Sequence, residues 1–195
     1  MSYTNEEILS LQNDPVFLND LLERENNAFH TKEISSLYDV LDTLLLFKTD
    51  TKERINKLYS FIIEEALNNL HIKLKNEELF DLNKKNDHYS LRAIYEYGIE
   101  QYNGGQLHEA KELFIMLSIL TDNNVFKGAM QIHLISILKE ISFENFLEDF
   151  VDMDKMESEN ESFFILYFHD KANQFLHKHA NLIKSAIQEV KNIKI

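Results

Sequence analysis

Residues that interrupt regular secondary structure are rare in this chain. Its 195 residues include one proline and four glycines. Strands in a sheet need turn residues about every 8–12 positions, and this sequence does not supply them. Apolar residues still make up 44% of the chain, which allows a packed core. We therefore expect an all-α fold built from long helices.

Three of the four glycines, Gly98, Gly104 and Gly105, lie close together in the stretch from Tyr95 to Asp122. Gly98 falls in the middle of a predicted helix, where glycine costs about 1 kcal/mol relative to alanine. Its presence there predicts that another helix packs against its backbone. Gly104 and Gly105 end the helix, where a left-handed residue is needed. The stretch is predicted to form two helices joined by a tight turn.

The spacing around these glycines is typical of one repeat type. A small residue, a turn glycine, an alanine and an aromatic residue follow one another as Gly98, Gly105, Ala110 and Phe114. This is the order found in a tetratricopeptide unit of about 34 residues. We assign these four residues to the packing of one such repeat.

Residues 1–85 are predicted to form a separate helical region. Asp14 and Pro15 make a helix start, with aspartate as the N-cap and proline as the first helical residue. Residues 31–72 predict an antiparallel helix pair that turns near residues 48–50. Its leucine-rich faces form a core or a self-association surface. The polar stretch 83–87 is interpreted as the connection to the next region.

Residues 86–195 are predicted to form a tetratricopeptide-like array of about three helix pairs. The first pair covers residues 89–103 and 106–121. The second covers 126–140 and 143–150, without the turn glycine and the alanine of the first. The charged stretch 152–161 is interpreted as a connection, and residues 162–177 and 180–193 as the third pair. Three units are about the minimum that stack stably.

One face of the first helix carries the residues that we expect to bind a ligand. Tyr95, Ile99 and Tyr102 are spaced i, i+4 and i+7, and the first helix of a tetratricopeptide pair lines the concave surface. Tyrosine has a large apolar ring and a polar tip, which suits a groove for an extended apolar peptide. Gln131 and Leu134 complete the predicted client groove. Alternatively, the aromatic residues pack on the N-terminal helices.

At this point the sequence resembles a known family, the class II chaperones of bacterial type III secretion. These proteins hold hydrophobic translocator proteins in the cytoplasm. The resemblance covers residues 93–124 and follows the family pattern at nine positions: Tyr95, Gly98, Tyr102, Gly105, Glu109, Ala110, Phe114, Leu117 and Leu120. The second unit departs from the family pattern, and the N-terminal region is longer than the family norm.

The resemblance implies three tetratricopeptide-like units with flanking helices and a cytoplasmic chaperone of a bacterial secretion system. The concave groove would bind a short extended segment of the translocator through Tyr95, Ile99 and Tyr102. Because N-terminal segments often mediate dimerisation in the family, residues 31–72 are a candidate homodimer interface. The alternative function is an adaptor or regulatory scaffold that binds a folded protein partner.

Composition and motifs disfavour other classes of function. The net charge of −13 argues against binding to a nucleic-acid backbone, and no apolar run reaches the roughly 18 residues of a membrane span. The chain has no cysteine, and the spacings of His169, His177 and His179 do not place three metal ligands on one helix face. Nucleotide-binding and hydrolase motifs are absent. We expect no cofactor, no metal, no stable membrane insertion and no enzymatic activity.

Overall fold

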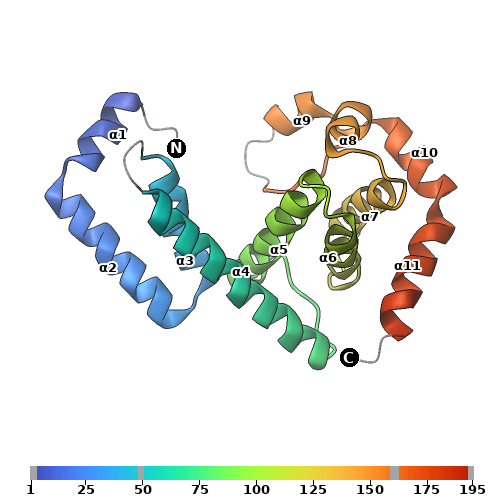
Figure 1. The fold of residues 1–195 in the computed structure, drawn as a ribbon, viewed down its shortest axis with the longest axis horizontal. Coiled ribbons are helices and arrows are strands. Elements are labelled where there is room, and N and C mark those ends of the chain that lie inside the picture. Colours follow the sequence, from blue (N-terminus) through green and yellow to red (C-terminus); the bar gives the residue numbers. More distant parts are fainter. Residues whose placement is uncertain (1–3, 48–50, 159–162, 193–195) are drawn as a thin grey trace. The chain divides into compact units, whose positions relative to one another are not determined.

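The computed structural model describes residues 4–47, 51–158 and 163–192. The regular secondary structure of these residues is helical, and turns, loops and isolated β-bridges connect the helices. This confirms the predicted all-α class. The helices, shown in Figure 1, are α1 (Asn5–Gln12), α2 (Pro15–Thr31), α3 (Ile34–Leu45), α4 (Lys52–Lys75), α5 (Lys85–Asn103), α6 (Leu107–Ile119), α7 (Asn124–Leu138), α8 (Phe143–Phe150), α9 (Met153–Ser158), α10 (Asp170–Lys178) and α11 (Ala180–Asn192).

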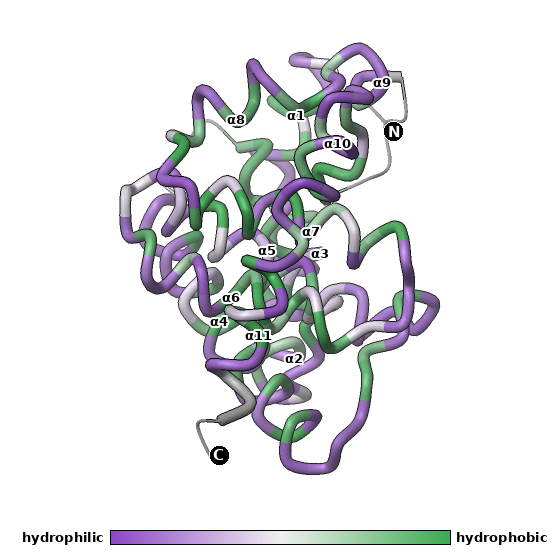
Figure 2. The backbone as a smooth tube through the Cα atoms, turned by 90° about the vertical axis from the view of Figure 1, so that its right-hand side faces the viewer, coloured by the Kyte–Doolittle hydropathy of each residue, from purple (hydrophilic) through white to green (hydrophobic). Residues whose placement is uncertain are grey.

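The chain divides into two compact units by its internal contacts. Unit 1 is Met1–Leu70 and unit 2 is His71–Ile195, so the division falls inside α4. Green and purple stretches follow one another along most of the helices in Figure 2, as expected of helices that bury one face.

Unit 1 has an aliphatic core formed by α2, α3 and α4. As predicted, α2 begins with Asp14 as N-cap, whose carboxylate accepts a 2.9 Å hydrogen bond from the backbone N–H of Val16. The turn predicted at residues 48–50 lies outside the described residues. The core side chains are at most 3% exposed: Leu21, Ala28, Ile34, Leu37, Tyr38, Val40, Leu41, Leu44, Leu58, Ile62 and Ala66.

Two ion pairs join the helices at the edge of this core. Arg54 of α4 donates to the buried carboxylate of Glu25 in α2. Lys32, which ends α2 in a left-handed conformation, lies 2.7 Å from the carboxylate of Glu65 in α4. Both pairs therefore connect α2, or the residue that ends it, to α4 by charge-assisted hydrogen bonds.

Unit 2 is built around α6, which packs against both α5 and α7 (Figure 1). Gly98 of α5 lies against α6, because a Cβ at this position would come within 3.2 Å of the Phe114 ring. Gly105 has φ +78° and ends α5. Its N–H bonds to Tyr102 O, and the N–H of Gln106 bonds to Gln101 O, which is the pattern of a Schellman motif. The further arrangement as a repeat array stays a prediction.

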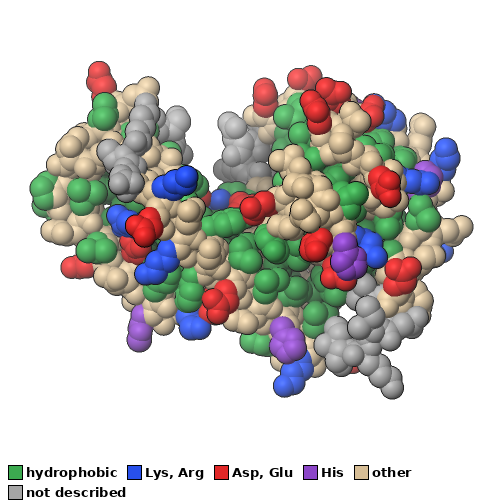
Figure 3. Space-filling model, in the orientation of Figure 1, with side chains coloured by type: hydrophobic (Ala, Val, Ile, Leu, Met, Phe, Trp, Pro, Cys, Tyr) green, Lys and Arg blue, Asp and Glu red, His purple; other side chains and the backbone are tan. Residues whose placement is uncertain are grey.

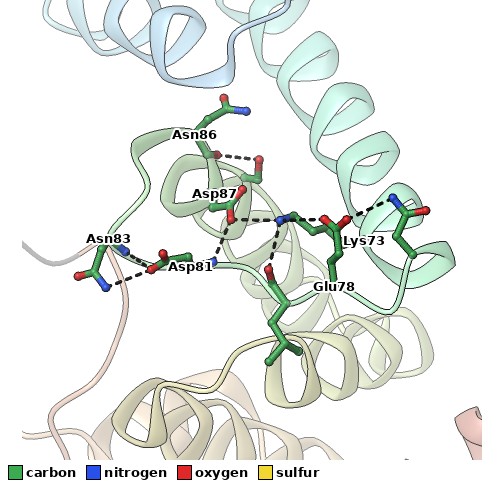
Figure 4. A network of polar contacts seen from close by, with 9 residues as sticks. Lys73, Glu78, Asp81, Asn83, Asn86 and Asp87 are labelled. Carbon is green, nitrogen blue, oxygen red and sulfur yellow. Dashed lines mark hydrogen bonds and ion pairs between the residues drawn. The ribbon is translucent and has the colours of Figure 1, made fainter.

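The polar stretch at residues 83–87 was expected to be a connection, but α5 already begins at Lys85. The difference arises because Asp87 is an anchor in the first helical turn. Its carboxylate accepts from the backbone N–H of Asp81 at 2.9 Å and from Lys73 Nζ of α4 at 3.3 Å (Figure 4). Lys73 also donates to Leu79 O at 3.2 Å. Polar side chains here hold the α4–α5 loop in place.

The C-terminal part of unit 2 differs from the predicted third helix pair. The charged stretch 152–161, expected to be a connection, contains the short helix α9. The helix expected over residues 162–177 begins only at Asp170, because residues 163–169 are not helical: they start with a bend at 163–164 and then run on as an extended loop with a β-bridge at Phe168. Their backbone bonds go to other parts of the chain: Asp152 N–H donates to Tyr167 O at 3.0 Å, and His169 N–H donates to Phe150 O at 2.9 Å.

Candidate binding site: an aromatic cluster that holds an extended segment

Four helices of unit 2 contribute rings to one group, which we call the aromatic cluster and which is buried except for the half-buried His88. Its members are His88 and Tyr95 of α5, Phe114 of α6, Phe126 and His133 of α7, and Phe146 of α8. His133 lies at the centre, stacked on Phe114 with ring centroids 4.8 Å apart and 4.6 Å from Phe146. The cluster forms because α5, α6 and α7 each turn an aromatic face toward the same space.

The extended segment, residues 163–169, inserts its first buried ring into this cluster. Phe164 is 3% exposed. Its ring centroid lies 4.9 Å from that of Phe126, 5.3 Å from Tyr95 and 5.4 Å from His88. The ring therefore fills a socket formed by α5 and α7. It meets Phe126 and Tyr95 edge-to-face, a geometry that aromatic pairs favour, and His88 at a tilt.

Four residues later, Phe168 enters the other side of the cluster. Its ring lies 5.9 Å from His133 and 6.2 Å from Phe146. Phe168 also forms an antiparallel bridge with Val151, directly after α8. The extended segment is thus held by two aromatic anchors and by the short backbone pairing with residues 150–152.

A chain of hydrogen bonds links the backbone of the segment to the cluster. The Ile165 N–H donates to the Tyr95 hydroxyl at 3.0 Å, and this hydroxyl lies 3.2 Å from His133 Nε2. His133 Nδ1 lies 2.8 Å from the Ala129 carbonyl. Because a carbonyl only accepts, Nδ1 carries the proton and Nε2 is free to accept from Tyr95. The Tyr95 hydroxyl therefore bonds to the backbone of the segment, while the Tyr95 ring packs against Phe164.

Burial controls the protonation of this chain of hydrogen bonds. Removal from water lowers the pKa of His133 to about 4, and the backbone hydrogen bond to Ala129 opposes this only in part. Burial also raises the pKa of Tyr95 above its ordinary value. At neutral pH both side chains are uncharged, as the hydrogen-bond directions require.

Arg92 of α5 borders the cluster where the extended segment enters. It is 7% exposed, and its Nε donates to the Glu96 carboxylate at 2.7 Å. Its guanidinium lies 3.9 Å from the ring centroid of Phe163. This cation–π contact fixes the beginning of the segment beside Tyr89 and His88, whose rings lie 5.8 and 6.0 Å from Phe163.

The structure places the predicted groove residues at different depths. Tyr95, Tyr102 and Leu134 are at most 3% exposed, while Ile99 and Gln131 are half-buried. Tyr102 donates to Ile141 O at 2.7 Å and packs beside Phe143 and Phe146 of α8. Tyr95 lies under the extended segment, so another ligand reaches it only after that segment leaves. Contact of these residues with a client stays a prediction.

The repeat-packing residues lie together in the α5–α6 hairpin. Ala110 and Phe114 of α6 are fully buried, and Phe114 contacts Gly98 and Tyr95. His133 and the extended segment were not singled out from the sequence. Residues 163–168 are six consecutive apolar residues, four of them aromatic, which is typical of a short buried extended segment. Such a run is also found in buried helices, so the sequence alone does not distinguish the two.

The described surface exposes both apolar and acidic side chains. In unit 1, Leu9, Val16, Leu22 and Leu45 are about half exposed or more. Most of the leucine-rich faces of α3 and α4 are used inside unit 1, so dimerisation through residues 31–72 stays a prediction. Acidic side chains are scattered over both units on the face drawn in Figure 3, in keeping with the net charge of −13.

Among the described residues, no three His, Asp or Glu side chains are grouped as metal ligands, and no helix is long and apolar enough to cross a membrane. Comparison of the chain with models of known protein families, with curated proteins and with solved structures finds no match. The aromatic cluster and the extended segment that it holds are therefore the candidate functional site.

Proposed function

We propose that this protein is a non-enzymatic chaperone that holds an extended apolar segment of a protein partner against α5 and α7. The observation that carries the proposal is that this face already binds an extended aromatic segment, residues 163–169 of the same chain. Proteins that bind extended peptides use backbone hydrogen bonds for affinity and side-chain pockets for specificity, and this face provides both.

The class of partner follows from the chemistry of the face. Its ring sockets are apolar, so a client must bring large apolar side chains that aggregate when exposed. The net charge of −13 would keep the complex soluble. The resemblance of residues 93–124 to translocator chaperones supports a client of that kind, a secreted hydrophobic protein kept soluble before export.

The proposal is tested by capture of partners from a lysate of the source cell, followed by mass spectrometry. Wild type is compared with Tyr95→Phe, which keeps the ring and removes the hydroxyl that accepts the Ile165 N–H. Tyr97→Phe, a half-buried tyrosine of the same helix, is the matched control. We expect a partner with long apolar segments, insoluble when expressed alone, whose recovery falls roughly five- to thirtyfold in Tyr95→Phe only.

A different result would favour the alternative function. If wild type and both variants recover the same partner equally, and that partner is folded and soluble alone, the protein is an adaptor or scaffold. The surface that binds it would then lie away from Tyr95.

A further inference from the structure

The extended segment, residues 163–169, occupies the face that the proposed function assigns to a client. We propose that this segment is an exchangeable internal occupant, and that the site accepts partner segments with two aromatic residues four positions apart, in the place of Phe164 and Phe168. This inference rests on the proposed function: it names the chemistry of the client and the way in which its site is regulated.

The spacing requirement follows from the positions of the two anchors. Phe164 fills the socket of His88, Tyr95 and Phe126, and Phe168 packs on His133 and Phe146. Between the anchors the chain is extended, and the side chains of residues 165–167 are only half-buried. Phe168 is half-buried as well, so the two anchors are defined by their ring contacts: those of Phe164 given above, and those of Phe168 with His133 and Phe146. Phe163 contacts the His88 ring where the segment begins.

The polar contacts with the segment place little demand on its sequence. Tyr95 accepts the N–H of Ile165, and residues 150 and 152 bond to the backbone of residues 167 and 169. Any residue except proline provides these groups. A foreign peptide with the same aromatic spacing can make the same bonds, which is the requirement for exchange.

The internal segment is covalently linked to its site, so it is present there at an effective concentration of the order of millimolar. This linkage opposes exchange with a free peptide. A free peptide at micromolar concentration then binds weakly until the internal copy is weakened. Regulation follows from this competition: weakening the anchors Phe164 and Phe168 of the internal segment opens the site, and a client with stronger anchors displaces the segment.

The test uses a fluorescein-labelled peptide of residues 160–171 and fluorescence anisotropy with the full-length protein. Wild type is compared with Phe164→Ala/Phe168→Ala, in which the internal copy lacks both anchors. We expect the variant to bind the peptide at least about tenfold more tightly than wild type. A control peptide with alanine at both phenylalanine positions should not bind either protein.

A second variant locks the internal segment in place. Val151 and Phe168 form the non-hydrogen-bonded pair of an antiparallel bridge. Cα atoms of such pairs lie about 4.5 Å apart, within the range for a disulfide. The chain has no other cysteine, so Val151→Cys/Phe168→Cys can form only this intramolecular bond. We expect the reduced variant to bind the labelled peptide and the diamide-oxidised variant not to bind it.

Three results would overturn the inference. One is equal peptide binding by the oxidised and reduced variants. Another is a folded double-alanine variant that binds no more tightly than wild type. The third is a double-alanine variant that has lost its helical circular dichroism and does not regain it with peptide, since the segment is then a fixed part of the core. Recovery of helix on peptide addition supports exchange. None of these measurements needs the client, so failed capture from lysate rejects the proposed function without deciding this test.

Discussion

The cores of the two units contain different types of side chain. Unit 1 buries mainly aliphatic side chains from α2, α3 and α4, and its charged groups pair at the edge of the core. Unit 2 buries a cluster of aromatic rings with a histidine and a tyrosine hydroxyl in its centre. An aliphatic core selects side chains by their volume, whereas a buried chain of hydrogen bonds also requires donors and acceptors to point in set directions. Unit 2 can therefore fix the register of an extended segment that has only short backbone pairing.

The largest effect is expected from a substitution that removes the Phe114 ring from the core of unit 2. Phe114→Ala should destabilise unit 2 by about 3–5 kcal/mol, because Phe114 is fully buried and supports both His133 and Gly98. Hydrogen exchange with mass spectrometry would measure the loss of protection in α5–α7. Val125→Ala, at a side chain 67% exposed, is the control and should change little. Equal loss of protection in α2 and α3 would show that the two units do not unfold independently.

The next effect is a pH dependence confined to unit 2. The pKa of His133 is about 4 in the folded chain, against about 6.5 when unfolded. Between these values the unfolded chain binds more protons, so stability falls as pH drops from about 6.5 to 4, by about 3 kcal/mol in total, and does not change above 6.5 from this group. Denaturant unfolding of α5–α7 as a function of pH would measure it.

The control for this pH dependence is His133→Phe, which keeps a ring and removes the titrating group. Its stability should vary less with pH over the same window than that of wild type. The histidine of unit 1, His30, is exposed, so α2 and α3 provide an internal comparison. A pH profile shared by wild type and His133→Phe would remove His133 as the cause.

A smaller effect tests the edge of the unit 1 core. Arg54→Met should destabilise unit 1 by roughly 1–3 kcal/mol, because it leaves the buried Glu25 carboxylate without its charged donor. The double variant Glu25→Leu/Arg54→Met should recover most of the loss, since a well-packed apolar pair can replace an ion pair. Protection of the α2 and α4 amides against hydrogen exchange would measure the stability of both variants. A double variant as unstable as Arg54→Met would assign the effect to packing by the arginine stem.

The smallest expected effect is at the surface of unit 1. Arg24 Nη1 lies 3.3 Å from Asp39, but the aspartate side chain is 72% exposed. Asp39→Asn should therefore change stability by less than about 1 kcal/mol, and the change should shrink at high salt. Thermal unfolding at two salt concentrations would measure it. A larger, salt-independent loss would mean that Asp39 has a role in packing.

Local sequence rules account for much of what was predicted correctly. The scarcity of glycine and proline indicated an all-α chain, and Asp14–Pro15 located a helix start, because both depend on the backbone of a few neighbouring residues. The positive φ at Gly105 was likewise predictable from the local sequence. By contrast, the polar residues 83–87 were assigned to a connection because the sequence does not reveal that Asp87 pairs with Lys73.

The sequence by itself determined the helical class, the α5–α6 hairpin and its close-packing glycine. Only the tertiary structure decided that residues 163–169 are extended, since a short run of aromatic residues suits either conformation until its partners are known. Those partners, Tyr95, Phe126 and His133, lie 30 or more positions away in the chain. The buried hydrogen bonds that select the extended form exist only after α5, α7 and the segment have come together.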